Sequence, residues 1–200
     1  MHDNKFDPKK LQKLNHPGRL IDIPPDTIWG RLDIDKPDVL VEIGAGTAFF
    51  SVAFLRYATA ATLYACDISD RMIRWVKENI CPKYPNIITL KTEETSVPLE
   101  DGIADLVYMI NLHHELNSPA TTVRESFRLL KPGGTIFIVD WKKKKMPEGP
   151  PLTIRYSPET VKEQLEDGGF GRVTMYDELA KHFLVVGKKA SGACPDRHAF

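Results

Sequence analysis

Two glycines and a glutamate at the end of a predicted buried strand are the residues whose types and spacing most clearly suggest ligand chemistry. Glu42, Gly44 and Gly46 lie in one short segment, and helical periodicity begins directly after it. Glycine at both positions removes side chains that would keep a nucleoside away from the backbone, although a tight turn with positive φ is an alternative explanation. The Glu42 carboxylate would repel a pyrophosphate but could attract an ammonium or sulfonium charge. The segment therefore favours a cationic nucleoside.

Acidic residues after the next two predicted strands support this interpretation. Asp67 follows the glycines by roughly 20 residues, the spacing at which a carboxylate can accept both hydrogen bonds of a ribose diol. Capping of the following helix is the alternative role. Glu93 and Glu94 follow the third strand, where a carboxylate could accept a hydrogen bond from an adenine amino group or simply be solvated. A dinucleotide fingerprint needs a third glycine where this chain has Phe49, so NAD is disfavoured.

Two histidines could supply acid–base chemistry. His113 and His114 follow the fourth predicted strand after two residues, at the same sheet edge as the glycine turn. A phenol, hydroxyl or activated carbon acting as nucleophile can need a base, and imidazole is suited to that role near neutral pH. We expect His114 to be this base. The alternative is that one histidine caps or packs under the loop while the other is exposed.

Strand-length apolar runs alternate with helical patterns from residue 39 onward, which predicts a parallel sheet covered by helices. The predicted parallel strands span residues 39–43, 62–66, 87–91, 105–110 and 135–139. The predicted helices span residues 48–57, 71–80, 120–130 and 157–167. Pro132, Gly133 and Gly134 are expected to end the third helix. Two later runs, 172–176 and 182–187, have only a short link between them and should form an antiparallel edge hairpin.

The predicted organisation is an N-terminal cap or lid over residues 1–36, one ligand-binding domain over 37–187, and a C-terminal tail over 188–200. The proline-rich segment 146–151 should form a wall of the substrate pocket. Trp29 and Tyr156 could complete an apolar lid there, or they could be ordinary core aromatics.

Composition excludes several function classes. Lys plus Arg and Asp plus Glu both number 27, so a net charge of zero gives no field for holding nucleic acid or an anionic membrane. The polar start carries no leader or anchor pattern, which predicts a cytoplasmic protein. Cys66, Cys81 and Cys194 lack CxxC spacing, so we expect reduced thiols and no metal site. The lysine run 142–145 is interpreted as a solvated loop.

Five segments, in this order, resemble the class I S-adenosylmethionine-dependent methyltransferases, and more narrowly the small-molecule branch related to the ubiquinone and menaquinone C-methyltransferases. These segments are residues 42–47, 65–69, 92–99, 105–107 and 129–134. The resemblance covers roughly residues 37–187. It implies a Rossmann-like α/β fold, with a seven-stranded, mostly parallel sheet, an antiparallel C-terminal edge hairpin, and helices on both faces.

The resemblance also implies S-adenosylmethionine as cofactor. The residues that match the family's cofactor-binding positions are Glu42, Gly44, Gly46, Asp67, Ile68, Glu93, Glu94 and Asn111. The first three would line the methionine part, and Asp67 would hold the ribose hydroxyls. Ile68 would pack on the adenine face, with Glu93 beside its amino group and Glu94 adding backbone contacts. Asn111 would face the amino acid end or the methyl group.

The expected function is methyl transfer to a small organic molecule, without a nucleic-acid or membrane partner. An alternative is a non-catalytic module of the same fold that binds a nucleoside or docks a partner. A nicotinamide-dependent reductase is a third hypothesis, which Phe49 disfavours.

Overall fold

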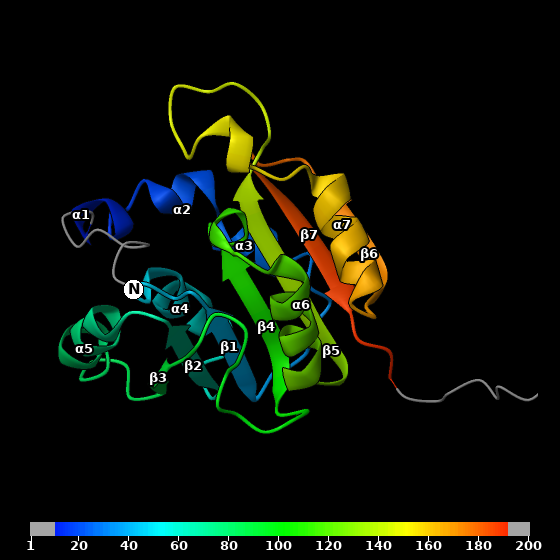
Figure 1. The fold of residues 1–200 in the computed structure, drawn as a ribbon. Coiled ribbons are helices and arrows are strands. Elements are labelled where there is room, and N and C mark those ends of the chain that lie inside the picture. Colours follow the sequence, from blue (N-terminus) through cyan, green and yellow to red (C-terminus); the bar gives the residue numbers. More distant parts are fainter. Residues whose placement is uncertain (1–10, 192–200) are drawn as a thin grey trace, which may run out of the picture.

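A seven-stranded sheet runs through the centre of the computed structural model, which describes residues 11–191 (Figure 1). Its strands are β1 (Val39–Ile43), β2 (Thr62–Asp67), β3 (Ile87–Lys91), β4 (Ala104–Ile110), β5 (Leu130–Trp141), β6 (Gly171–Tyr176) and β7 (His182–Lys188). The α-helices are α1 (Leu11–Leu14), α2 (Arg19–Asp22), α3 (Pro25–Trp29), α4 (Phe49–Leu55), α5 (Asp70–Asn79), α6 (Pro119–Leu129) and α7 (Pro158–Asp167). Short 3-10 helices are η2 (His113–Glu115) and η3 (Leu152–Ile154).

The strand order, β3-β2-β1-β4-β5-β7-β6, confirms the predicted fold class. Strands β3, β2, β1, β4 and β5 pair in parallel, so their carboxyl ends meet at one edge. Strand β7 lies antiparallel to β6, as the short link between them predicts, and it is also antiparallel to β5. The chain order reverses direction across the sheet between β1 and β4, which is where open sheets of this kind bind ligands.

Helices cover both faces of the sheet (Figure 1). On one face, Ile28 of α3, Phe54 of α4 and Val76 of α5 belong to one buried apolar cluster. On the other face, Val123 of α6 and Val161 of α7 belong to a second. Burial on both faces explains why the parallel strands are continuous hydrophobic runs rather than alternating ones.

Strand β5 begins earlier than its sequence predicts. Helix α6 ends at Leu129, and β5 starts at Leu130 instead of Thr135. Its pairing with β4 shifts register between Ala104 and Leu106, so the Pro-Gly-Gly segment lies in an irregular part of the strand. The proline favours extended backbone before it, and Gly133 has a φ of +82°. The Pro-Gly-Gly segment therefore makes an irregularity within β5 and does not form a turn before it.

Short helices α1, α2 and α3 make up the described part of the predicted cap. Figure 1 shows α1 and α2 at the end of the sheet toward which the arrows of β4 and β5 point. Residues 1–10 of the cap, and Cys194 in the tail, lie outside the described residues. Of the remaining cysteines, Cys66 is a buried free thiol in β2 and Cys81 is a partly buried one.

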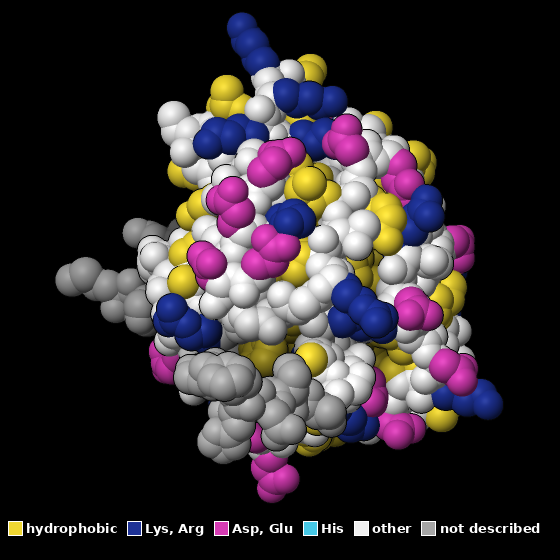
Figure 2. All heavy atoms as spheres, turned by 90° about the vertical axis from the view of Figure 1, so that its right-hand side faces the viewer, with side chains coloured by type: hydrophobic (Ala, Val, Ile, Leu, Met, Phe, Trp, Pro, Cys, Tyr) yellow, Lys and Arg dark blue, Asp and Glu magenta, His cyan; other side chains and the backbone are white. Residues whose placement is uncertain are grey.

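Surface charge is mixed on the side of the molecule where α7 and β6 lie. Figure 2 shows Lys and Arg side chains interspersed with Asp and Glu there, and neither sign dominates the described part of that face. In the lysine run, Lys142 pairs with Asp177 at 2.7 Å, and the next three lysines are exposed. Within residues 11–191, no helix has the length and apolar character required to cross a bilayer.

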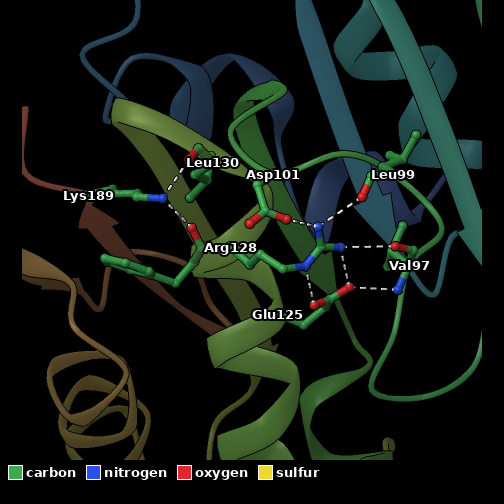
Figure 3. A network of polar contacts seen from close by, with 8 residues as sticks. Val97, Leu99, Asp101, Glu125, Arg128, Leu130 and Lys189 are labelled. Atoms are coloured by element: carbon green, nitrogen blue, oxygen red, sulfur yellow. Dashed lines mark hydrogen bonds and ion pairs between the residues drawn. The ribbon is translucent and has the colours of Figure 1, made fainter.

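One arginine fixes the loop between β3 and β4 (Figure 3). Arg128, near the end of α6, donates from Nη1 to the Leu99 carbonyl at 2.8 Å and from Nη2 to the Val97 carbonyl at 3.0 Å. It also pairs with Glu125 at 2.7 Å and with Asp101 at 2.5 Å. The planar guanidinium makes all these contacts at once, so the loop is tied to α6.

We predict that Arg128→Lys lowers the free energy of unfolding by about 1–3 kcal/mol, because a single ammonium cannot replace the fork of donors to two carbonyls and two carboxylates. Urea denaturation measures the change. Arg124→Lys is the matched control, since Arg124 is an exposed residue of the same helix. Equal stability of the two variants would contradict the role of Arg128 in holding the loop between β3 and β4.

Candidate functional site

A cavity opens at the carboxyl ends of β1 to β4, and all eight predicted cofactor residues line it. They are Glu42, Gly44, Gly46, Asp67, Ile68, Glu93, Glu94 and Asn111. The parallel sheet brings together residues from four separate strand ends because these ends share one edge. The remaining wall comes from Leu14 and Arg19 of the N-terminal segment and from Phe49 and Phe50 of α4.

The glycine turn after β1 forms the floor of this cavity. Gly44 and Gly46 have φ values of +73° and +55°, in the left-handed region that favours glycine. A Cβ on Gly44 would lie 2.7 Å from the Leu112 side chain, whereas one on Gly46 would have Leu14 at 3.8 Å as its nearest neighbour. Both proposed reasons for glycine therefore apply: the backbone conformation requires it, and the space above Gly46 stays open.

Asp67 joins the end of β2 to this turn. Its Oδ2 accepts a hydrogen bond from the Gly46 N–H at 2.8 Å, and its Oδ1 accepts one from the Ser69 N–H at 2.8 Å. Burial raises the pKa of Asp67, and these backbone hydrogen bonds oppose the rise. Capping of α5 is performed by Ser69, whose Oγ accepts from the Met72 N–H. Each carboxylate oxygen retains a second lone pair for a ligand hydroxyl.

Glu42 is a carboxylate with only 3% of its surface exposed. Its Oε2 accepts hydrogen bonds from the Ser51 hydroxyl and, at 3.2 Å, from the Tyr108 hydroxyl. Burial raises its pKa from 4.5 to about 7, because these two hydrogen bonds and the charge of Arg19 only partly offset desolvation. A cation placed in the cavity would favour the ionised form.

Loops after β3 and β4 complete the cavity. Glu93 is exposed at its rim, and its N–H donates to the Ser96 carbonyl. The Glu94 carboxylate accepts from the Asn117 side chain at 2.8 Å and from the Ser118 N–H at 3.1 Å, so it ties this loop to the start of α6. Asn111 has a φ of +55°, and its Oδ1 is buried without a hydrogen-bond partner among residues 11–191.

A second cavity adjoins the first and shares four lining residues with it, Leu14, Arg19, Asn111 and Glu115. Its apolar wall contains Ile23, Trp141, Pro150, Pro151 and Ile154. Lys181 bridges Asp22 of α2 at 2.9 Å and Glu148 at 2.6 Å, which ties two walls together. The predicted wall segment therefore lines this cavity at positions 148–151. Trp29 instead stacks on Tyr57 at 5.0 Å, and Tyr156 packs edge-on against His113, as core aromatics do.

His114 lines the second cavity and is held by Asp140 at the end of β5. Its Nδ1 lies 2.8 Å from Asp140 Oδ1, and its backbone N–H donates to Oδ2 at 2.9 Å. Burial lowers the pKa of His114, but the hydrogen bond and the charges of Asp140 and Glu115 outweigh it, so the pKa is raised overall. His113 instead is fully buried and bonds to Gln164 at 2.7 Å. The two histidines thus have different environments, and His114 is the one at the cavity.

Three residues near the cavities lie outside the sequence-based site, namely Arg19, Asp140 and His182. A lone arginine in an aperiodic segment carries no motif, and His182 stands in an ordinary apolar run of a strand. Asp140 did have a signal, since it is a carboxylate that ends a buried strand at the ligand-binding edge. His182 is 1% exposed, and burial lowers its pKa to about 4, so its ring is neutral at pH 7.

Comparisons with known proteins agree with this geometry. A family model described as a methyltransferase domain matches residues 41–138. An S-adenosylmethionine-dependent methyltransferase structure from Aquifex aeolicus is 30% identical, with a TM-score of 0.85, and the match covers 92% of this chain and 98% of that one. A putative type 11 methyltransferase structure from Sulfolobus solfataricus is 26% identical, with a TM-score of 0.68 and coverage of 90% and 97%.

A demethylmenaquinone methyltransferase of Streptomyces avermitilis is 27% identical over 61% of this chain and 52% of its own length. The chain spans about half the length of the curated relatives that it matches. Fold, site and comparisons together define a class I methyltransferase fold. The chain belongs to the S-adenosylmethionine-dependent methyltransferases.

We predict that Glu42→Gln stabilises the ligand-free protein at pH 8 by roughly 2–3 kcal/mol, because the raised pKa of Glu42 makes its ionisation costly in the folded state. Between pH 4.5 and about 7, the folded protein keeps a proton that the unfolded chain has lost. The contribution of Glu42 to the free energy of unfolding therefore falls as pH rises through this window.

Chemical denaturation at pH 5 and pH 8 measures the effect. The gain should be much smaller at pH 5, because the folded protein then keeps the Glu42 proton and holds no buried charge there. Glu163→Gln, at an exposed position of α7, is the control and should give the same small change at both pH values. A pH-independent effect of Glu42→Gln would rule out a buried, titrating carboxyl.

Proposed function

We propose that this chain binds S-adenosylmethionine in the first cavity and transfers its methyl group to a small organic molecule held in the second. The observation that carries the proposal is the junction of the two cavities, which share Asn111 and Arg19. A ligand in one cavity would therefore meet a ligand in the other. Methyl transfer requires this arrangement, since the reacting atoms must approach to about 3–3.5 Å.

Charge and shape support the cofactor assignment. The buried Glu42 carboxylate suits a ligand with a positive centre, and the Asp67 carboxylate offers acceptors for two ribose hydroxyls. The open space above Gly46 admits the ligand to the backbone. Ile68 supplies an apolar surface for the adenine ring, with Glu93 and the loop held by Glu94 at its rim. Asn111 would orient the methyl end.

Chemistry at the junction needs little from the protein beyond positioning. The methyl carbon leaves sulfur with no bonding electrons, and the electron pair of the broken C–S bond stays on sulfur as a neutral thioether. The leaving group therefore needs no proton. If the acceptor is a hydroxyl, its proton must go elsewhere as the new bond forms. His114 lines the acceptor cavity and is oriented by Asp140, so it is our proposed base.

The acceptor cavity favours a small, largely apolar molecule over a polymer. Its walls carry Trp141, two prolines and two isoleucines. Two of its carboxylates, Asp22 and Glu148, share an ion pair with the single ammonium of Lys181. The zero net charge of the chain provides no general attraction for nucleic acid. The relatives named as demethylmenaquinone methyltransferases make quinols sensible first acceptors for a screen. We propose a cytoplasmic location.

Calorimetric titration tests the cofactor assignment. We predict that the wild-type protein binds S-adenosylmethionine and S-adenosylhomocysteine but neither NADH nor ATP. We also predict that Asp67→Ala weakens binding by roughly 1–3 kcal/mol, through the loss of charge-assisted hydrogen bonds to the ribose and of the support for the glycine turn.

Asp70→Ala is the matched control, because Asp70 is an exposed carboxylate three residues further along that pairs with Lys91. Unchanged affinity in Asp67→Ala would remove the ribose assignment. Failure of the wild-type protein to bind either adenosyl compound would overturn the proposed function.

We predict that His114→Ala lowers turnover on a confirmed hydroxyl acceptor by about a hundredfold or more, the range typical of a lost general base, while S-adenosylhomocysteine affinity stays unchanged. Methyl transfer from labelled S-adenosylmethionine is the measurement. Asp140→Asn should lower turnover as well, since it removes the charge that holds His114.

Lys143→Ala, at an exposed lysine, should leave turnover intact and serves as control. Full activity of His114→Ala would exclude this residue as the base. Binding of both adenosyl compounds without transfer to any tested acceptor would favour the non-catalytic module instead.

A further inference from the structure

Arg19 places a fixed positive charge on the wall that the two cavities share. It is the first residue of α2, and its Nη1 donates to the Leu14 carbonyl at 2.5 Å. The guanidinium carbon lies 4.6 Å from the centroid of the Phe50 ring and 5.4 Å from that of Phe49. Two aromatic faces and a backbone carbonyl therefore hold the group in place.

This guanidinium lacks a carboxylate partner within residues 11–191. Arg31 and Arg128, by contrast, pair with carboxylates at 2.8 Å and 2.5 Å. Burial lowers the pKa of Arg19 to about 10, and the charge of Glu42 opposes this shift. The group is thus still charged at neutral pH, and within the described residues only the Leu14 carbonyl accepts from one of its five N–H donors. A partly buried charge without a partner is costly unless a ligand supplies one.

Glu42 contributes the opposite charge to the same cavity. The two groups feel each other's charge but form no ion pair, because each has its own anchor. Ser51 and Tyr108 hold the carboxylate, while Leu14 and the two phenylalanines hold the guanidinium. A guanidinium and a carboxyl group whose ionised form a ligand cation would favour face one cavity, and together they are complementary to a zwitterion with an ammonium and a carboxylate, as at the end of an α-amino acid.

We infer that Arg19 binds the carboxylate at the amino acid end of the adenosyl ligand, opposite the ammonium group that Glu42 attracts. This inference rests on the proposed function and extends it to the N-terminal segment, which lies outside the sheet. An acidic acceptor in the second cavity could present the same carboxylate chemistry to Arg19, so the experiment has to separate these two sources.

Calorimetry with a matched ligand pair makes that separation. The pair is S-adenosylhomocysteine and its decarboxylated analogue, in which hydrogen replaces the carboxylate. The wild-type protein should bind the first roughly tenfold to a hundredfold more tightly, the range expected for a charge-assisted hydrogen bond. Arg19→Gln should lose this preference by losing affinity for S-adenosylhomocysteine alone. Arg19→Lys should recover part of it, since an ammonium keeps the charge but not the fork of donors.

Arg31→Gln is the matched control. Arg31 also lies over an aromatic ring, at 5.1 Å from that of Tyr176, but it is exposed and lines neither cavity. This variant should keep the full preference. Thermal unfolding of each variant checks that the fold is retained, and Arg19→Lys provides the comparison if Arg19→Gln unfolds.

Three results would overturn the inference. One is a wild-type protein that binds both ligands equally. Another is an Arg19→Gln variant that keeps the preference or loses affinity for both ligands alike, which would mean that Arg19 only shapes the cavity. The third is benzoate binding to the S-adenosylhomocysteine-saturated protein that depends on Arg19 while the preference stays intact, which would assign the carboxylate to the acceptor. Absence of binding by either adenosyl ligand would instead overturn the proposed function itself, together with this extension of it.

Discussion

The attachment of the turn after β1 to the end of β2 sets the geometry on which the whole site depends. Cys66 accepts hydrogen bonds from the N–H groups of Gly44 and Ala45, and the Asp67 carboxylate accepts one from Gly46. The turn is therefore held by three consecutive amides against the neighbouring strand. It cannot move away from the sheet without breaking bonds that the sheet itself positions. The same carboxylate that offers acceptors to a ligand also maintains the surface on which the ligand would rest.

Two buried carboxylates lie at strand ends beside the cavities. Glu42 and Asp140 are both almost completely buried, yet each occupies the carboxyl end of a strand in the central sheet. Elsewhere the strands are apolar and packed between two hydrophobic clusters. Burying a carboxylate opposes folding unless hydrogen bonds or charges compensate, and here compensation is incomplete for Glu42. A less costly residue at that position would make a more stable protein with a weaker field for cations.

Much of this arrangement could be predicted from the sequence, for physical reasons that differ between elements. Strands β1 and β3 have the predicted bounds, because a short continuous apolar run that ends in polar residues is typical of a strand buried on both faces. The start of β5 was not predictable, because Pro-Gly-Gly indicates a turn locally and only pairing with β4 extends it. The environment of His114 also depends on tertiary contacts, since its partner Asp140 is 26 residues away. Arg19 had no local signal, and its significance lies in the absence of an ion-pair partner, which only three-dimensional neighbours reveal.

Lys181 pairs with Asp22 and Glu148 in the wall of the second cavity, and this wall tolerates substitution differently from the first cavity. The first cavity is built mainly from strand ends, where a changed residue would disturb register and core packing together. Two walls of the second cavity come from α2 and from the loop after β5, and they meet through Lys181, Asp22 and Glu148. Sequence drift in those walls leaves the sheet intact. On the proposed function, such a chain could change the molecules that it accepts over evolutionary time while the architecture of the proposed adenosyl site stays constant.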